Sequence, residues 1–238
     1  MERIDKILSS QNIGSRREIK QLIRQGAVLL NGVAVKRPEE KTNPDTDIIT
    51  VSGVVLNFKR NLYIMMNKPA GVLSATRDNR QKTVLDLIPE ELKRRDLFPA
   101  GRLDKDTEGL LIITDDGALA HDMLSPTKHV YKLYEAEVDR ALTENDCLLF
   151  RNGITIGEQS FLPAEIKLIS STKALVRVRE GKFHQIKRMF EAVGTHVLTL
   201  KRLRIGDLWL DKALLPGECR ELTADEIPLL ISHNDFSL

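Results

Sequence analysis

Residues 101–117 read GRLDKDTEGLLIITDDG, and this stretch carries the strongest structural signal in the chain. Asp104 stands in a basic loop after a glycine, between Arg102 and Lys105, and an apolar run from Leu110 to Ile113 follows it. A short apolar run bounded by turn residues is typical of a buried strand. The sequence therefore predicts a carboxylate at the mouth of a sheet, with a cation on each side of it.

The pattern around this strand predicts more strands than helices after residue 61. Strands are expected at residues 62–66, 110–114, 132–138, 164–169, 174–179 and 197–205. Helices are expected at residues 83–87, 117–124, 143–150 and 183–193. Because the two kinds of element do not alternate regularly, the pattern favours an α+β domain on a mostly antiparallel mixed sheet flanked by helices over a doubly wound parallel sheet.

The beginning of the chain carries its own local signals. Ser15 and Glu18 have the spacing of a capping box that opens a helix, and Gly26 marks the end of that helix. Asn31-Gly32 separates two apolar runs, and this dipeptide is the strongest short-range signal of a hairpin. These signals predict a small unit of helix and hairpin.

A polar, turn-rich stretch over residues 36–60 follows this unit and contains one expected strand at 48–51. The length of 238 residues suits one small and one medium domain. We therefore expect a first domain with its linker at residues 1–60 and a second domain at residues 61–238.

Charge is concentrated in two segments, although the net charge is only +2. Residues 1–24 carry six Lys/Arg against three Asp/Glu, and residues 177–204 carry eight against two. Separated basic clusters point to nucleic acid. From charge alone, a pair of solvated surfaces without a partner is an equally good interpretation.

Several classes of protein are disfavoured by the composition. Cys147 and Cys219 lie far apart without CxxC spacing, so neither a disulfide framework nor a zinc site is predicted. The start of the chain lacks the apolar segment of a secretory signal, and no apolar run approaches the roughly 20 residues that span a bilayer. We expect a cytoplasmic protein with no metal and no membrane partner, and a monomer by default.

An amphipathic helix with cations on its polar side can lie along a phosphate backbone, where the cations gain affinity by releasing counterions. The helix, its glycine stop and the Asn-Gly hairpin occur in an order that resembles the S-four-type RNA-binding domain, a small αL module, over residues 1 to about 48. The resemblance implies that five cations face RNA: Arg3, Arg16, Arg17, Lys20 and Arg24. A solvated helix face is the alternative interpretation of these charges.

Four separated segments of the second domain resemble the pseudouridine synthases of the RsuA type. They are NKPAG at 67–71, GRLD at 101–104, KLY at 132–134 and EGKFHQIKRM at 180–189. Together with the first domain, the resemblance extends over about residues 3–230. It implies a small αL RNA-binding domain followed by a pseudouridine-synthase domain.

The resemblance also implies roles for individual residues. Asp104 is the implied catalytic carboxylate, and Tyr134 is the implied aromatic platform that stacks on the extruded uracil. Lys187 is placed beside the aspartate, where a cation favours the charged form of a carboxylate. Arg102 and Lys68 are expected to hold the RNA. Without the resemblance, Asp104 is interpreted as a turn or capping residue and Tyr134 as a half-buried sheet tyrosine.

Three further polar residues of these segments are interpreted more plainly. His184 is expected to be a structural or RNA-facing donor, since no second ligand stands at zinc spacing from it. Asp106 and Glu108 are expected to solubilise the loop after the aspartate. No metal ligand is therefore predicted among them.

The implied activity is the conversion of uridine to pseudouridine in 16S rRNA, at uridine 516 by family inference. The reaction exchanges a carbon–nitrogen bond for a carbon–carbon bond without redox change, so no cofactor is expected. His184 and Lys187 favour the small-subunit branch, because large-subunit relatives tend to carry arginine at both positions. The partner is 16S rRNA or a small-subunit assembly intermediate. The alternatives are a 23S rRNA pseudouridine synthase and a non-catalytic ribosome-binding protein.

Overall fold

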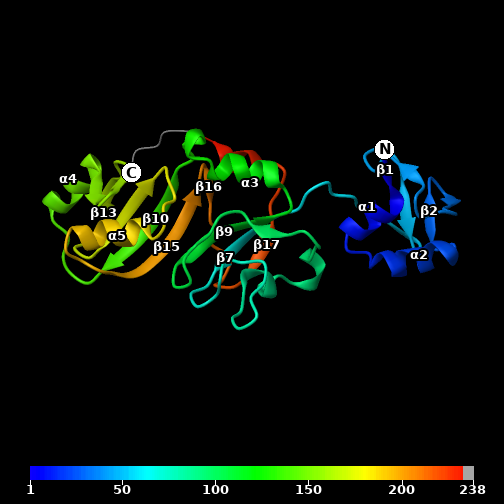
Figure 1. The fold of residues 1–238 in the computed structure, drawn as a ribbon, viewed down its shortest axis with the longest axis horizontal. Coiled ribbons are helices and arrows are strands. Elements are labelled where there is room, and N and C mark those ends of the chain that lie inside the picture. Colours follow the sequence, from blue (N-terminus) through cyan, green and yellow to red (C-terminus); the bar gives the residue numbers. More distant parts are fainter. Residues whose placement is uncertain (233–238) are drawn as a thin grey trace. The chain divides into compact units, whose positions relative to one another are not determined.

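The structure, a computed structural model, describes residues 1–232, and their contacts divide them into two units (Figure 1). Unit 1 comprises Met1–Leu62 and Pro89–Leu97, and unit 2 comprises Tyr63–Ile88 and the chain from Phe98 onward. The segment Pro89–Leu97 thus joins unit 1, although the sequence division places it in the second domain. Among residues 1–232, no helix is long and apolar enough to cross a membrane.

Unit 1 packs two helices, α1 (Ile4–Ser10) and α2 (Arg16–Arg24), against a small sheet. The sheet has the order β3 (Val33–Ala34), β2 (Val28–Leu30), β5 (Ile49–Val51) and β6 (Val54–Val55). A separate pair joins β1 (Glu2–Arg3) to β4 (Lys41–Thr42), and η2 (Glu90–Leu92) lies in the second segment. Apolar residues of both helices and of the sheet form one core, which includes Ile7, Ile19 and Val28.

The local signals of unit 1 act as the sequence predicts. The Ser15 hydroxyl accepts from the Glu18 amide, and the Glu18 carboxylate accepts from the Ser15 amide, which completes the capping box of α2. Asn31 and Gly32 both have positive φ angles, 49° and 82°, as a tight hairpin turn of the type I′ kind requires. Ser52 and Gly53 repeat this geometry between β5 and β6.

Unit 2 is built on a nine-stranded mixed sheet. The sequence predicted a mostly antiparallel mixed sheet and six of these nine strands. The main path of the sheet runs β13 (Glu165–Leu168), β14 (Lys173–Val178), β10 (Lys132–Val138), β15 (Val197–Ile205), β9 (Glu108–Thr114), β7 (Tyr63–Lys68) and β17 (Cys219–Glu221). Two further strands are β8 (Phe98–Pro99) on β9 and β16 (Leu208–Trp209) on β15. Every pairing is antiparallel except that of β9 with β15.

Short helices and one hairpin complete unit 2. The helices are α3 (Gly117–Leu124), α4 (Glu144–Asn152), α5 (Gln185–Ala192), and the 3-10 turns η1 (Val84–Leu87), η3 (Pro126–Lys128) and η4 (Ile227–Ile231). The hairpin joins β11 (Ile154–Ile156) to β12 (Gln159–Phe161). The helix expected at residues 83–87 is therefore a 3-10 turn rather than an α-helix.

Two separate cores lie on the sheet of unit 2. One packs α4 and α5 on β10, β13 and β14, with Phe150 and Phe190 in ring contact at its centre. The other packs α3 and η4 on β7 and β9, around Met65 and Leu110. Figure 1 shows α4 and α5 at the β13 end of the sheet and α3 away from them. β15 contributes to both cores, with Leu200 in the first and Ile205 in the second, and its parallel pairing with β9 joins the two parts of the sheet.

Candidate active site

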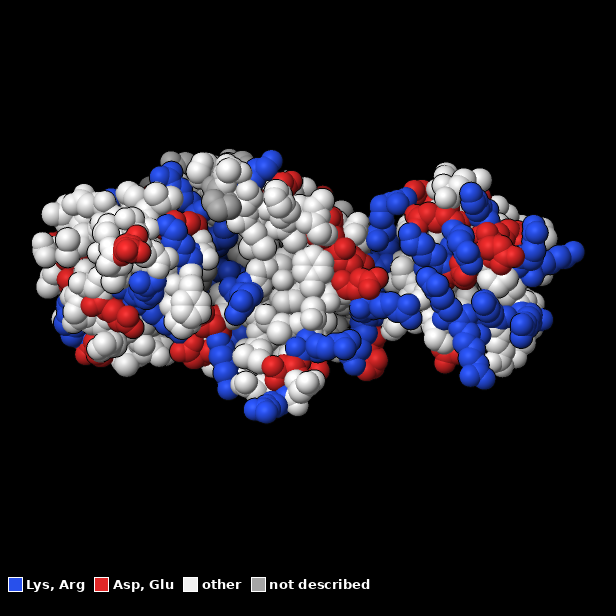
Figure 2. Space-filling model, viewed as in Figure 1, with Lys and Arg blue, Asp and Glu red and all other residues white. Residues whose placement is uncertain are grey.

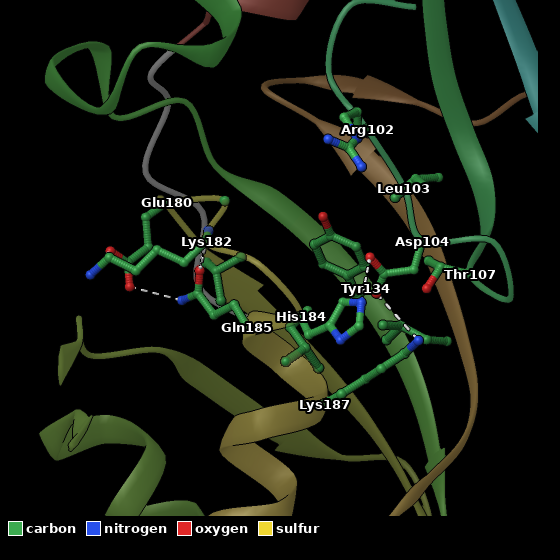
Figure 3. A pocket seen from close by; sticks show the side chains of 14 residues that line it. Arg102, Leu103, Asp104, Thr107, Tyr134, Glu180, Lys182, His184, Gln185 and Lys187 are labelled. Atoms are coloured by element: carbon green, nitrogen blue, oxygen red, sulfur yellow. Dashed lines mark hydrogen bonds and ion pairs between the residues drawn. The ribbon is translucent and has the colours of Figure 1, made fainter. Parts of the chain in front are cut away.

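A cavity in unit 2 gathers the three residues that the sequence assigns to catalysis (Figure 3). Asp104 comes from the loop between β8 and β9, Tyr134 from β10 and Lys187 from α5. These positions are separated by up to 83 residues in the chain, and the fold brings them to one place. The predicted convergence is therefore confirmed, whereas the roles of the three residues are a matter for experiment.

Asp104 is held between two nitrogen donors. The Lys187 ammonium lies 3.2 Å from one carboxylate oxygen, and His184 Nε2 lies 3.5 Å from the other. The Asp104 side chain keeps about a quarter of its surface exposed, at 28%. It is therefore accessible to a substrate while its orientation is defined from both sides.

Lys187 also bonds to Asp106, which changes our interpretation of that residue. The Lys187 ammonium donates to an Asp106 carboxylate oxygen at 2.5 Å. Burial acts against the charge of Lys187, but the bond to Asp106 and the attraction of Asp104 outweigh it and raise the lysine pKa. The same bond lowers the pKa of Asp106. Asp106 is thus the second anchor of the cation beside Asp104, rather than only a solubilising residue.

Lys68 does not face RNA, and this prediction from the sequence is wrong. Its side chain is fully buried, and its ammonium donates to the carbonyl oxygens of Pro69, Lys105 and Thr107 at 3.0, 3.2 and 2.9 Å. Burial lowers its pKa to about 8. Three acceptors use all three ammonium protons, so Lys68 fastens the end of β7 to the loop that carries Asp104.

The loop around Asp104 is fixed by further bonds on its other side. The Ser74 hydroxyl donates to the Leu103 carbonyl at 2.9 Å and accepts from the Leu103 amide at 3.1 Å. The Gly71 amide donates to the Lys105 carbonyl at 2.7 Å. The backbone on both sides of Asp104 is therefore tied to the segment that follows β7.

Tyr134 has a buried neighbour that the sequence did not single out. Arg202 of β15 is 4% exposed, and its Nε donates to the Leu110 carbonyl at 2.7 Å. Its Nη1 lies 3.5 Å from the Tyr134 phenol oxygen, and its guanidinium lies 6.0 Å from the ring centre. The charged segment 177–204 contains Arg202, but nothing in its local pattern marks this cation as buried.

Lys132, the lysine of the KLY segment, turns away from the cavity. Its ammonium is buried and donates to the Met123 carbonyl of α3 at 3.3 Å. Burial and the nearby Arg202 charge lower its pKa to about 8. Tyr134 is thus the member of this segment that lines the cavity.

The entrance to α5 forms another wall of the cavity. Glu180 accepts from the Leu162 amide at 2.8 Å and from the Gln185 side chain at 2.9 Å, which fixes the turn before the helix. His184 precedes α5 in the left-handed region, with φ of 50°. Phe183 stacks on His184 with ring centres 3.7 Å apart and is 70% exposed. Within residues 1–232, no group of three His, Cys, Asp or Glu residues could hold a metal ion.

The remaining predicted RNA contacts differ in how freely they face solvent. Arg102 is exposed and lines the cavity (Figure 3). In unit 1, Figure 2 shows Lys and Arg side chains spread over the surface, and four of the predicted cations are exposed on α2: Arg16, Arg17, Lys20 and Arg24. Arg3 instead forms a two-point bond with Asp5, at 3.0 and 2.8 Å. Its guanidinium is therefore already engaged within unit 1.

Comparisons with known proteins match both units. The family model of RNA pseudouridylate synthase matches residues 62–192, and the S4 domain model matches residues 2–48. An uncharacterized RNA pseudouridine synthase of Bacillus subtilis, YtzG, is 47% identical, covering 96% of this chain and 98% of its own. The ribosomal small subunit pseudouridine synthases A of Vibrio cholerae and Escherichia coli are 39% and 36% identical. They cover 94% and 96% of this chain, and 97% and 100% of their own lengths.

A solved structure agrees with these matches. The crystal structure of a pseudouridylate synthase superposes with a TM-score of 0.68 at 33% identity. The match covers 97% of this chain and all of that one. The similarity thus extends over the two units and is not confined to one of them.

Proposed function

The chain belongs to the RNA pseudouridine synthase family and is of the RsuA type, and on this basis we propose that it isomerises a uridine of 16S rRNA with Asp104 as the catalytic carboxylate. The target implied by the family is uridine 516. The small-subunit assignment is supported by the names of the relatives at 36% and 39% identity. We further propose that the enzyme works in the cytoplasm, where ribosomal RNA is made, and as a monomer.

The observation that carries the proposal is the convergence of Asp104, Tyr134 and Lys187 on one cavity. The isomerisation breaks the bond between C1′ and N1 and forms a bond between C1′ and C5 of the same uracil. C5 loses a proton and N1 gains one, so that no atom is gained or lost overall and nothing is oxidised or reduced. The side chains of the cavity can therefore supply the chemistry, and we propose that no cofactor takes part.

Each of the three side chains suits one requirement of this reaction. The Asp104 carboxylate is the partly exposed anion that acts on the extruded uridine. The Tyr134 ring offers a π-face on which the detached uracil can turn. Lys187, with its raised pKa, keeps a positive charge beside the carboxylate throughout neutral pH. Arg102, at the cavity rim, is the cation that receives the phosphate next to the target.

The test is pseudouridine mapping of 16S and 23S rRNA from cells that lack the protein. Complementation uses the wild type, Asp104→Asn, and Asp225→Asn as a matched control, since Asp225 is exposed elsewhere in unit 2. We expect one 16S pseudouridine to disappear with the protein, and to return with the wild type and the control but not with Asp104→Asn.

Other outcomes would revise particular parts of the proposal. A lost site in 23S rRNA would move the substrate to the large subunit. No lost site in either RNA would favour a non-catalytic ribosome-binding protein. Full restoration by Asp104→Asn would remove Asp104 from the chemistry.

A further inference from the structure

Phe183 is an exposed aromatic residue beside the catalytic cavity that the proposed chemistry does not use. Phe183 is 70% exposed, although an apolar ring has no favourable contact to make with water. Its ring lies against the His184 ring at an interplanar angle of 18°, so one face of Phe183 is covered. The other face is available to a flat apolar partner.

His184 connects this stack to Asp104. Its ring face rests on Phe183, while its Nε2 lies 3.5 Å from an Asp104 carboxylate oxygen. The residue adopts left-handed backbone geometry, which is unfavourable for a non-glycine residue. The bonds of Glu180 and Gln185 hold the turn in this form. His184, which lines the cavity, therefore carries the Phe183 ring at the cavity's edge.

The chemistry around the stack favours a nucleobase as its partner. Arg102 is exposed on the same cavity, whereas its two lysines are already paired with carboxylates, Lys182 with Glu180 and Lys187 with Asp104 and Asp106. Arg102 is therefore the lining cation that suits a phosphate-bearing chain. The ring spacing of 3.7 Å is close to the roughly 3.4 Å between stacked bases. A base next to an extruded nucleotide loses its stacking partner, which is unfavourable.

We propose that the free face of Phe183 stacks on the base that neighbours the target uridine, so that the Phe183–His184 pair replaces the lost stacking and sets the RNA in register with Asp104. This platform presupposes the uridine isomerisation proposed above. It adds a determinant of substrate position that is distinct from the residues acting on the uracil.

The test measures binding of a 16S rRNA transcript to the Asp104→Asn protein, which binds without turnover, with and without Phe183→Ala. Because stacking on an aromatic ring contributes roughly 1–3 kcal/mol per base, we expect Kd to rise about 5- to 160-fold. The slope of log Kd against log salt should stay the same, because no ionic contact is lost. Phe183→Tyr should restore the affinity, and Phe183→Leu should restore only part of it.

The matched control is Leu215→Ala, since Leu215 is similarly exposed at 65% and belongs to the same unit. It should leave Kd unchanged, and none of the variants should lower the melting temperature. An unchanged Kd in Phe183→Ala, or equal rescue by leucine and tyrosine, would overturn the platform. Pseudouridine formation by the wild type on the same transcript is measured in parallel. Its absence would contradict the proposed function, whereas the binding results address Phe183.

Discussion

Gly109 and Arg202 approach each other so closely across the parallel pair β9–β15 that a β-carbon on Gly109 would lie 2.2 Å from the Arg202 carbonyl oxygen. The φ angle of Gly109 is 99°, which other residues rarely adopt. This glycine is therefore required twice, for space and for backbone conformation. It lets the strand behind Asp104 pair with the strand that carries Arg202.

We expect Gly109→Ala to destabilise unit 2 by roughly 2 kcal/mol or more, because the added methyl group must push two strands apart. Denaturant unfolding of the purified protein measures the change. Gly117→Ala is the control, since nothing lies within 4 Å of a β-carbon there and the residue begins α3. Equal stability of the two variants would show that the strands can separate without cost.

Lys68→Met should lower the rate at saturating RNA without changing RNA affinity, because Lys68 holds the loop of Asp104 and does not reach the surface. Single-turnover rates and Kd values separate the two effects. Lys20→Met on α2 is the counterpart, and it should weaken binding and reduce the salt slope by roughly 0.7–0.9 while leaving the rate unchanged. If Lys68→Met instead reduces the salt slope, Lys68 contacts RNA after all.

Arg202 should act through Tyr134, since its Nη1 lies 3.5 Å from the phenol oxygen. We expect Arg202→Lys and Tyr134→Phe each to lower kcat roughly three- to tenfold, as loss of a weak bond to a charged group would. The double variant should be no slower than the slower single variant, because both changes break one interaction. If the fold-decreases in kcat of the two single variants instead multiply in the double variant, the two side chains act independently.

The acid sensitivity of the protein should depend in part on Glu226. Two hydrogen bonds from Arg220, at 2.8 and 2.7 Å, lower its pKa from 4.5 to about 2. Glu226 is therefore protonated more readily in the unfolded chain than in the folded one. The stabilisation that it provides above pH 4.5 is lost as pH falls toward 2.

Glu226→Gln should be less stable against unfolding than the wild type at pH 7. This difference in stability should narrow as pH falls from about 4.5 to about 2. Unfolding midpoints measured at several pH values give this dependence. Glu158→Gln, at an exposed position between β11 and β12, should follow the wild type throughout. A gap that is independent of pH would exclude titration of Glu226 as its cause.

The elements that the sequence predicted well depend on neighbours in the chain. The capping box of α2 and the Asn31-Gly32 turn need only a few residues, and β10 has the bounds expected from its alternation. The hairpin β11–β12 and the strand β17 were missed, because strands of three residues form through pairing rather than propensity.

The site shows the same division between local and distant causes. The motif spacing predicted the meeting of Asp104, Tyr134 and Lys187. It could not show that Lys68 is buried, because that depends on carbonyl groups contributed by a loop 37 and 39 residues away. Arg202 was missed for a similar reason, since its acceptor at Leu110 lies 92 residues away in the chain.

The two cores of unit 2 contribute different parts of the catalytic group. Asp104 belongs to the loop that leads into β9, whereas Tyr134 and Lys187 belong to elements packed around α5. A substrate that contacts Asp104 as well as Tyr134 and Lys187 therefore bridges the two parts of unit 2. Its binding free energy adds to the cohesion of the whole catalytic unit.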